Sequence, residues 1–535
     1  MKQHANNGRA ELSPGRTHIV VVGDIILDRD ILGRTDRIAP DAPVPVLDVT
    51  SVRESPGGAG LTALLVAASG VTTTVIAPIA DDAAGDLVHR LLSQQITVIR
   101  LGHDGPTRRK TRVRSAGQSL LRIDDGGPGN PTTVDIDEVR RTLLSADVIL
   151  VSDYGAGVTR DDRFRDLLTE AAEQVMLVWD PHPRGGNPVR GSAIVTPNLA
   201  EAAAAVPANS SRRRPSGSNP IHRPEADRSP GADQPDRLAQ RLRQAWAADA
   251  VCVTAGAMGA FLASNDGQSH FLPAPAVQGG DPCGAGDRFA ASVAVALARG
   301  ALLTEAVTNG VVDASAWVQA GGAATFRPTD EPRQAAKATG GSAISGSSAD
   351  SSESPARSES LPALAARLRT AAGGDGTLVA TGGCFDIVHA GHVATLQAAR
   401  RLGDALVVLI NSDASVAKLK GPGRPVVNAQ DRVRVLSAFD CVDAVVEFDD
   451  DDPRAPLAAL QPDIWVKGGD YGATELPETE TVESNGGRVV LLPYLSGRST
   501  TNILQRSQHD AAHTSSPTPQ PAVVGGGVEA VERNQ

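Results

Sequence analysis

The sequence predicts two α/β domains joined by a flexible segment. Short β-branched runs that end in Gly or Asp recur along the first 330 residues, from HIVVVGDIIL to AVCVTAG, with Ala/Leu-rich stretches of helical length between most of them. This alternation is typical of βα units around a mainly parallel sheet. A second, shorter series begins at TLVATGGCFD and continues through ALVVLINSD, AVVEF, DIWVKGGD and RVVLLPY. It predicts a smaller α/β domain of the Rossmann type.

Changes in composition set the expected boundaries. Residues 206–236 are rich in Pro, Ser and charge, which predicts a disordered surface insertion. Gly, Ser and Ala dominate much of 330–374, which predicts a flexible linker. We therefore expect the first domain over 17–329, the second over 375–506, and a disordered tail over 507–535.

Composition excludes several classes of function. The chain of 535 residues carries a net charge of −11, and a broad nucleic-acid-binding face would need the opposite sign. The first 16 residues lack the apolar core of a signal peptide, and no run of about 18 apolar residues predicts a membrane span. The four cysteines are scattered without metal-ligand spacing, so we expect a reduced, cytoplasmic protein.

The segment Asp281-Pro-Cys-Gly-Ala-Gly-Asp287 precedes an apolar, helix-periodic stretch. Gly284, Ala285 and Gly286 would present backbone N–H groups at the positive end of a helix dipole, which suits a transferring phosphoryl group. Asp287 in the first turn would then accept the proton of an attacking sugar hydroxyl. The alternative is an ordinary Asp at a helix start after a Gly turn.

Acidic and glycine-rich segments upstream suit a sugar. Asp24 and Asp28 follow the first β-branched run, where carboxylates can hold sugar hydroxyls or act as turn and cap residues. Gly57 and Gly58 permit close approach of backbone to a ligand, or simply form a tight turn.

Two later segments suit ATP. Asn198-Leu199-Ala200-Glu201 follows the run AIVTP, and Glu201 is placed to organise Mg²⁺ and phosphates indirectly. A helix start capped by Asn198 is the alternative. The stretch from Thr254 to Gly259 turns through glycines, as a nucleotide loop or a hairpin does.

In this order the segments resemble the ribokinase-like (PfkB) carbohydrate kinase family over residues 17–329, which implies a three-layer α/β/α domain. By this resemblance Asp287 is the catalytic base, and Gly284, Ala285 and Gly286 form the anion hole. The sugar-contacting positions are Asp24, Asp28, Gly57 and Gly58. The positions on the ATP and magnesium side are Asn198, Leu199, Ala200, Glu201, Thr254, Gly256, Gly259 and Asn309.

The opening GDIILDRDILGRTDRIAPDAPVPVLDV resembles heptose 7-phosphate kinases in particular. In RRKTRVR, Lys110 and Arg112 are the candidates for binding the distal phosphate, with solvated strand charges as the alternative. The chain departs from the family at Leu61 (usually Asn), His182 (usually Lys) and Arg288 (usually Thr). These departures put sugar selectivity and rate in question, while the base and its glycine nest remain.

The segment from Thr381 to His392, TGGCFDIVHAGH, lies between a strand-like and a helix-like stretch. His389 and His392 are three residues apart, so a helix start would put both imidazoles on one side. Such a pair can grip a triphosphate and stabilise charge at the α-phosphorus. A zinc site is disfavoured because no third ligand lies at suitable spacing.

This string matches the HxGH nucleotidylyltransferase (cytidylyltransferase-like) family. KLKGPGRP, KGGDY and GRSTTN agree with it, the last as a phosphate-binding helix start or a capping sequence alone. By this resemblance the histidines are catalytic, and the nucleotide-binding positions are Gly383, Cys384, Phe385, Asp386, Gly391, Lys420, Lys467, Arg498, Ser499, Thr500 and Thr501.

A kinase followed by a nucleotidyltransferase resembles the bifunctional heptose kinase/adenylyltransferase family. That resemblance implies C1 phosphorylation of heptose 7-phosphate by ATP, transfer of AMP to heptose 1-phosphate, and Mg²⁺ as cofactor. It also allows a monovalent cation at the kinase site and a homodimer through the kinase domain. No nucleic-acid or membrane partner is expected. A different sugar, CTP in place of ATP, and a regulatory protein with a degenerate kinase domain are the alternatives.

Overall fold

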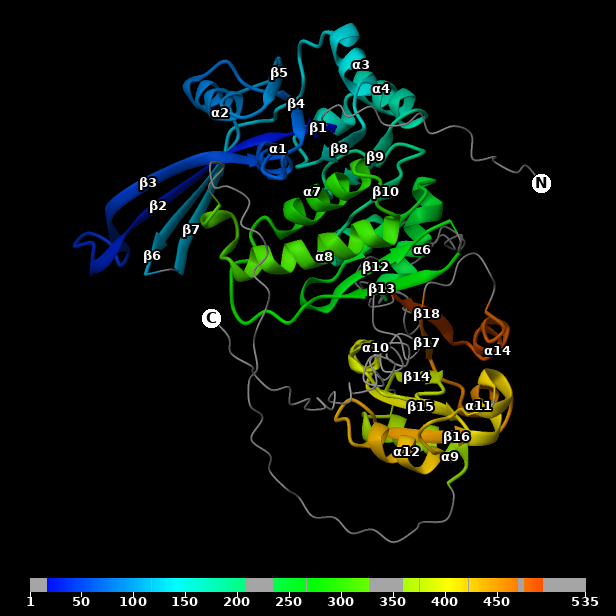
Figure 1. Cartoon of the computed structure of the whole chain (residues 1–535). Helices are drawn as coiled ribbons and strands as arrows, with labels where there is room; N and C mark the ends of the chain where they lie inside the picture. The colour runs from blue at the N-terminus through cyan, green and yellow to red at the C-terminus, as the bar shows by residue number, and fades with distance from the viewer. Residues whose placement is uncertain are drawn as a thin grey trace, which may run out of the picture. The chain divides into compact units, whose positions relative to one another are not determined.

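The computed structural model describes residues 17–116, 118–206, 234–265, 267–326, 359–374, 376–421, 423–469 and 476–493. The chain divides into two compact units, the first built mainly from residues up to 326 and the second mainly from 360–464 (Figure 1).

The first unit is organised around a mainly parallel sheet. Its strand order is β13-β12-β11-β10-β9-β8-β1-β4-β5, and β12 pairs antiparallel with both β11 and β13 while the other neighbours are parallel. The strands are β1 (His18–Gly23), β4 (Thr72–Pro78), β5 (Thr97–Leu101), β8 (Val148–Ser152), β9 (Met176–Asp180), β10 (Ile194–Val195), β11 (Val251–Thr254), β12 (Gly259–Ala263) and β13 (Ser269–Pro273).

Helices cover both faces of this sheet. Successive residues of a strand point to opposite faces, so Ile19 and Val21 of β1 pack in one core with α1, α7 and α8, while Val20 and Val22 pack in another with α3, α4 and α6. The predicted three-layer α/β/α arrangement is confirmed. The helices are α1 (Ala59–Ala67), α2 (Ala83–Ser93), α3 (Ile136–Leu144), α4 (Asp162–Ala172), α5 (Leu199–Ala205), α6 (Pro235–Trp246), α7 (Ala285–Ala298) and α8 (Leu303–Gln319), with short 3-10 turns at Val158–Arg160, Gly256–Met258 and Gly322–Ala324.

A separate four-stranded sheet projects from the first unit (Figure 1). It has the order β3-β2-β6-β7, with β2 (Ile25–Ile38), β3 (Pro45–Gly58), β6 (Arg109–Ser115) and β7 (Gln118–Asp125). The run HIVVVGDIIL therefore spans two strands in two different sheets, and Asp24 lies at the junction.

The second unit is a smaller α/β layer structure. Strands β14 (Leu378–Gly383), β15 (Ala405–Asn411) and β16 (Ala444–Phe448) are parallel, as expected. Its helices are α9 (Leu361–Ala371), α10 (Ala390–Arg400), α11 (Asp413–Lys420), α12 (Ala429–Ser437) and α13 (Arg454–Leu460), and β17 (Ile464–Gly468), α14 (Thr479–Ser484) and β18 (Arg488–Leu492) follow along the chain.

Two predicted boundaries need correction. The expected linker 330–374 contains α9, whose Leu364, Ala365 and Leu368 are buried, so this part is a packed helix. The expected insertion 206–236 overlaps the start of α6, in which Asp236 is buried. In both places an amphipathic helix follows a polar stretch, and composition alone placed the boundary too late. The predicted tail 507–535 lies outside the described residues.

In the described part of the chain, no helix has the length and apolar character needed to cross a bilayer. All four cysteines have free thiols.

Candidate functional site

The start of α7 carries the predicted phosphoryl-transfer group. Gly284 is the N-cap residue of this helix with φ 78°, a left-handed conformation that favours glycine. Ala285 donates its N–H to the Pro282 carbonyl at 3.0 Å, so this predicted anion-hole amide already has a partner. At Gly286 an added Cβ would meet nothing within 4 Å. The approach to the helix start is therefore open at Gly286.

Asp287 lies in the first turn of α7 and is only 6 % exposed. The phenol of Tyr154 donates to its two carboxylate oxygens at 2.6 and 2.7 Å. The hydroxyl of Thr62, on α1, donates to one of them at 2.7 Å. Burial raises the Asp287 pKa to about 6, although the Tyr154 and Thr62 hydrogen bonds act in the opposite direction. The carboxylate is thus ionised at neutral pH and poised to take a proton.

The sequence did not identify the two hydrogen-bond donors of Asp287. Tyr154 follows β8 directly, and ligand sites in open α/β sheets lie at the carboxyl ends of the strands, next to the point where the strand order reverses. The run ADVILVSDYG ends at this edge, between β1 and β9 in the strand order. That rule would have singled out Tyr154. Thr62 sits inside an apolar helical pattern and gave no comparable signal.

Asp24, expected either to hold a sugar hydroxyl or to act as a turn residue, is engaged by the backbone of the loop after β8. Its side chain is 2 % exposed, and it accepts hydrogen bonds from the backbone N–H groups of Tyr154, Ala156, Gly157 and Val158 at 2.8–3.3 Å. A carboxylate saturated in this way organises the loop after β8. The structure therefore argues against direct sugar contact and supports the turn-forming alternative.

Asp28 lies where the four-stranded sheet meets the main sheet. Arg112 donates to its carboxylate at 3.0 Å, and both side chains are less than one-fifth exposed. Burial raises the Asp28 pKa, against the effects of Arg112 and Lys110. An added Cβ on Gly57 would come within 2.3 Å of an Asp28 carboxylate oxygen, so glycine is needed here. The structure thus brings together Asp28 and Gly57, predicted to contact the sugar, and Arg112, predicted to bind its distal phosphate.

Lys110 and Gly58 adjoin the same region. The Lys110 ammonium lies 5.7 Å from the centre of the Tyr154 ring, which places this predicted phosphate-binding cation beside the partner of Asp287. Gly58 is the N-cap of α1 with φ 60°, and a Cβ there would meet the Asp24 carbonyl at 2.5 Å.

The predicted ATP-side segments meet at the ends of β10 and β11. Asn198 and Thr254 form an isolated parallel bridge, so the two segments are adjacent. Asn198 and Glu201 form a reciprocal capping box at the start of α5, which Leu199 and Ala200 open. The capping alternative is thus realised, and one Glu201 oxygen is engaged in it.

The glycines beyond Thr254 have the backbone freedom that their segment requires. Gly256 has φ 58° with open space at its Cβ, and Gly259 has φ 124° and is closely packed. The nucleotide role of both residues remains a prediction.

Two acidic residues that the sequence reading did not single out end the neighbouring strands. Asp180 ends β9 and accepts a hydrogen bond from Thr196 at 3.0 Å. Burial raises the pKa of Asp180 well above its usual range, and the negative charges of Asp287 and Glu201 raise it further. Asp153 accepts from Thr159, and burial raises its pKa to about 6. Their position at carboxyl strand ends is again the signal that could have found them.

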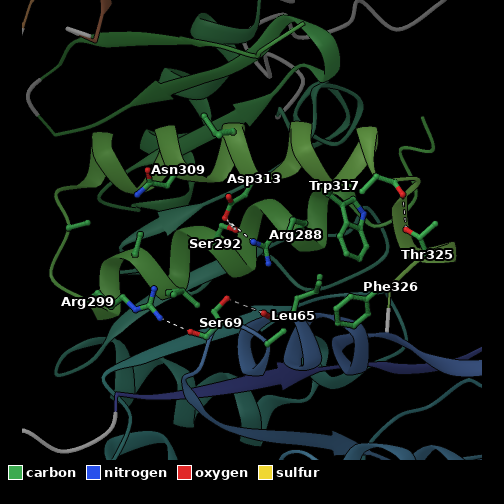
Figure 2. A pocket seen from close by; sticks show the side chains of 16 residues that line it. Leu65, Ser69, Arg288, Ser292, Arg299, Asn309, Asp313, Trp317, Thr325 and Phe326 are labelled. Carbon is green, nitrogen blue, oxygen red and sulfur yellow. Dashed lines mark hydrogen bonds and ion pairs between the residues drawn. The ribbon is translucent and has the colours of Figure 1, made fainter. Parts of the chain in front are cut away.

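Asn309, predicted on the ATP side, lies on α8. It lines a hollow of about 830 Å³ between α1, α7 and α8, together with Arg299, Asp313 and Trp317 (Figure 2). Among the described residues that line this hollow, Gly284 to Asp287 do not occur. The assignment of Asn309 to the ATP side, made by resemblance, remains a prediction.

The three departures from the kinase family each have a defined place. Leu61 lines a pocket of about 230 Å³ that Asp28 also lines. The His182 ring stacks on Tyr154 with centroids 6.5 Å apart. Burial lowers the pKa of His182 most, and the positive charge of Arg184 lowers it further. Arg288 donates to Asp313 at 3.0 Å in the hollow of Figure 2. None of these contacts removes the hydrogen bonds of Asp287.

The second site forms where α10 begins. His389 is the N-cap residue, and its Nδ1 accepts a hydrogen bond from the Gly391 N–H at 3.2 Å. The rings of His389 and His392 stack with centroids 3.9 Å apart, and Phe385 packs 5.0 Å from His392. The predicted pairing of the imidazoles is therefore present, beside the amides of a helix start.

His392 is held neutral. Burial lowers its pKa to about 4, and the neighbouring His389 and Lys420 act in the same direction. At neutral pH this imidazole therefore carries no charge. Lys420, exposed in the last turn of α11, supplies a positive charge close enough to influence it.

Asp386 has a structural environment. Its carboxylate accepts from the N–H groups of Val426 and Val427 at 2.6 and 3.1 Å and pairs with Arg424, and these hydrogen bonds hold its pKa below the usual range despite burial. It ties two loops of the unit together, which argues against the predicted direct nucleotide contact.

The loop that carries Cys384 is fixed by Arg432, a residue the sequence reading missed. Its guanidinium is 1 % exposed and donates to the carbonyls of Cys384 and Asn411 at 2.6 and 2.8 Å. Phe385 has φ 45°, which is strained for an aromatic residue. Gly383 ends β14 immediately before this loop.

Of the remaining predicted nucleotide contacts, Lys467 ends β17 with its ammonium 2.6 Å from Glu478 and over the Trp465 ring. Arg498, Ser499, Thr500 and Thr501 lie outside the described residues. No group of three or more His, Cys, Asp or Glu side chains arranged to hold a metal ion occurs in the described ranges.

Comparison with known proteins accounts for both halves of the chain. The pfkB family carbohydrate kinase description matches residues 16–330, and the Cytidylyltransferase-like description matches 380–506. A bifunctional protein HldE from Streptomyces coelicolor is 46 % identical over 93 % of this chain and 98 % of its own length. Another from Halorhodospira halophila is 38 % identical over 91 % and 96 %. Phosphofructokinase-2 from Escherichia coli, in its tetrameric inhibited form, superposes on 58 % of this chain and 97 % of its own with a TM-score of 0.44 at 19 % identity.

Proposed function

We propose, since the chain belongs to the pfkB family of carbohydrate kinases and to the family of bifunctional HldE proteins, that it is a two-site enzyme of ADP-heptose synthesis. The first domain phosphorylates C1 of D-glycero-β-D-manno-heptose 7-phosphate with ATP. The second transfers AMP from ATP to heptose 1-phosphate. The observation that carries this proposal is the presence, on one chain, of a buried carboxylate and a pair of imidazoles, each at the start of a helix.

In the kinase reaction Asp287 accepts the proton of the C1 hydroxyl. The anomeric oxygen forms a bond to the γ-phosphorus, the bond to the β,γ-bridging oxygen breaks, and ADP leaves. Gly286 and its neighbours at the positive end of α7 face the charge that develops on the phosphoryl group. Asp28 and Arg112 orient the sugar, and Lys110 supplies positive charge beside Tyr154.

In the transferase reaction a phosphate oxygen of heptose 1-phosphate attacks the α-phosphorus of ATP in line. A P–O bond forms there, the bond to the β-phosphate breaks, and pyrophosphate leaves. Neutral His392 and its partner His389 hydrogen-bond to the charged oxygens, with the helix-start amides of α10 behind them. No covalent enzyme intermediate is required.

Mg²⁺ fits the kinase site as a partner of ATP. Asp180 and Glu201 lie near Asp287; burial raises the pKa of Asp180 most, and the negative charges of Asp287 and Glu201 raise it further. A divalent cation relieves such repulsion, and Asp180 and Glu201 would hold it together with phosphate oxygens and water. When bound, Mg²⁺ neutralises charge on the transferring phosphoryl group. A monovalent cation near the Asp281 and Cys283 carbonyls, which converge on Gly322, is part of the same proposal.

A homodimer through the projecting sheet also belongs to this proposal. Val52 on β3 and Leu120, Leu121 and Ile123 on β7, the two edge strands of this sheet, are each at least 45 % exposed. A second copy of the chain would cover them.

The direct test is mass spectrometry of the purified full chain with defined substrates. Heptose 7-phosphate with ATP and Mg²⁺ should give heptose 1,7-bisphosphate and ADP, and heptose 1-phosphate with ATP should give ADP-heptose and pyrophosphate. Fructose 6-phosphate, ribose 5-phosphate and CTP serve as competing substrates. A clear preference for one of these would reject the heptose or ATP assignment, and equal background transfer by wild type and Asp287→Asn would reject kinase activity altogether.

A further inference from the structure

Tyr154 approaches the catalytic carboxylate more closely than any sugar-site residue described above. We propose that Tyr154, assisted by Thr62, is a positioning residue that fixes the Asp287 carboxylate for proton transfer and keeps it ionised. This inference rests on the proposed kinase function and assigns a role to two side chains that no sequence motif marked.

The hydrogen-bond pattern gives each hydroxyl a defined direction. The Tyr154 phenol has one proton, and its distances of 2.6 and 2.7 Å to the two oxygens of Asp287 describe one donor shared between them. An ionised carboxylate only accepts, so Thr62 also donates to it at 2.7 Å. The Thr62 oxygen then accepts from Ser152, whose hydroxyl lies 3.0 Å away. Asp287 is therefore held from two elements, the loop after β8 and helix α1.

Tyr154 is itself fixed on several sides. Its backbone N–H donates to the buried Asp24 at 3.1 Å, its ring stacks on His182, and the Lys110 ammonium lies over the ring. Burial and the neighbouring Asp287 charge raise its pKa well above the usual range, so the phenol keeps its proton under all working conditions. It can act as a permanent donor and not as an acid.

Several other ionisable groups face Asp287 from the elements around it. Asp28 on β2 opposes ionisation of Asp287, and Lys110 on β6 favours it. Asp180 at the end of β9 and Cys283 before α7 also interact with its charge. Of the side chains around Asp287 in the described part of the chain, only Tyr154 and Thr62 donate hydrogen bonds to its carboxylate. They are the groups that offset the cost of burying this charge.

The consequence for the reaction concerns geometry and protonation. The carboxylate must be ionised before the C1 hydroxyl can transfer its proton, and it must present a lone pair toward the acceptor hydroxyl. A donor that spans both oxygens fixes the plane of the carboxylate. Without it, the group would rotate more freely and would take up a proton at higher pH.

The test is the pH dependence of kcat/KM for heptose phosphorylation by the full chain carrying Tyr154→Phe. This change keeps the ring contacts and removes one hydroxyl. We expect the acidic limb to move from near pH 6 to higher pH by about one unit. The variant should then lose about fivefold more activity at pH 6 than at pH 8. Substrate ionisation is the same for both proteins and cancels in the comparison.

Thr62 supplies a matched pair of variants should Tyr154→Phe fail to fold. Thr62→Val removes the hydroxyl at nearly constant volume and should shift the limb in the same direction, whereas Thr62→Ser keeps the donor and should restore the wild-type profile. The KM for ATP should remain unchanged in all three, because neither side chain belongs to the predicted ATP segments. AMP transfer by the same preparations reports how much of the chain is folded and active.

The outcomes separate this inference from the proposed function. If the wild-type chain phosphorylates heptose 7-phosphate but Tyr154→Phe and Thr62→Val leave the acidic limb in place, with a loss that is equal at every pH, then the positioning role is wrong and the kinase function stands. If the wild-type chain does not phosphorylate the sugar, the proposed function itself fails. A shifted limb in either variant, with rescue by Thr62→Ser, supports the inference.

Discussion

The kinase site and the transferase site both lie where a helix begins, yet they treat charge in opposite ways. Asp287 is a buried carboxylate that is kept ionised by donated hydroxyl protons, and its pKa is raised only to about 6. His392 is a buried imidazole that is kept neutral, with its pKa lowered to about 4. Burial acts against the charged form in both cases. The difference is that two hydroxyls donate hydrogen bonds to Asp287, whereas the neighbouring His389 and Lys420 oppose a positive charge on His392.

The chemistry explains this contrast. A sugar hydroxyl must lose a proton before it attacks the γ-phosphorus, so the kinase needs an ionised base. The phosphate oxygen that attacks in the second reaction carries no proton at neutral pH, so that site needs donors for phosphate oxygens and no base. Each helix-start site therefore has the protonation state that its own reaction requires.

Asp287→Asn should abolish sugar phosphorylation and leave AMP transfer intact. Asparagine has nearly the same shape and still accepts from Thr62, but it cannot take the proton of the C1 hydroxyl. Removing a general base typically costs 10²–10⁴-fold, so we expect a loss of about 10³-fold in kcat. The measurement is the rate of ADP release with heptose 7-phosphate, with AMP transfer by the same protein as the control. Equal loss of both activities would mean that the two sites are not chemically separate.

His392→Ala should give the reciprocal pattern. It removes a neutral donor to the triphosphate next to His389 and leaves the kinase unit unchanged. We expect AMP transfer to fall by about 10²–10³-fold, in the range found when one donor to a developing charge is removed. Pyrophosphate release measures the effect. A loss below about threefold would contradict a direct role for the stacked imidazoles in transition-state stabilisation.

Asp24→Asn tests the correction to the sugar site. The amide brings two N–H groups to face backbone donors, so the loop that carries Tyr154 should loosen. We expect the first unit to lose about 2–4 kcal/mol of stability and kinase kcat to fall about 10-fold or more, with little change in KM for the sugar. Urea unfolding followed by tryptophan fluorescence and steady-state kinetics measure the two effects. A raised sugar KM with unchanged kcat would instead restore the direct sugar contact predicted from the sequence.

Asp24 also shows where sequence reasoning reached its limit. The βα alternation gave both α/β domains, because strand and helix periods are local properties of the chain. The GAGD and HxGH strings predicted the two helix-start sites, because a glycine turn followed by a helix is also a local pattern. Whether Asp24 faces a sugar or four backbone amides depends on the loop after β8, about 130 residues further along the chain. No local pattern encodes that partner.

Some of the residues that were missed follow the same logic. Thr62 and Arg432 act through contacts between distant elements, and each looks like an ordinary helix residue in sequence. Tyr154 follows the end of β8, so the rule for strand ends could have found it. Asp180 was within reach, since it ends a strand at the edge where ligands gather. Asn309 was assigned to the ATP side by resemblance alone, and in the structure it lines the hollow of Figure 2.

The two reactions should respond differently to mild acid. Asp287 loses its charge as pH falls through about 6, so kinase kcat/KM should drop to about half at pH 6 relative to its plateau. His392 stays neutral until pH approaches 4, so it contributes no titration to AMP transfer over the same range. Parallel profiles from pH 5 to 8, with Tyr154→Phe as a kinase variant whose limb should move, measure the contrast. Coincident limbs in all three profiles would point to substrate ionisation as their common origin.

Arg288→Thr, which restores the residue usual in the kinase family, should have the smallest effect. Arg288 directly follows the catalytic base, yet its guanidinium turns away to Asp313, and Ser292 donates to the same carboxylate at 2.7 Å. A partly exposed ion pair of this kind contributes about 0–1 kcal/mol. Kinase activity should therefore change by less than about threefold, and the free energy of unfolding by less than about 1 kcal/mol. Asp313→Asn is the matched control, because it weakens the same pair from α8. A gain of tenfold or more in kinase rate for Arg288→Thr alone would show that this arginine restrains the catalytic turn, and the chain would then be a kinase held below its full activity.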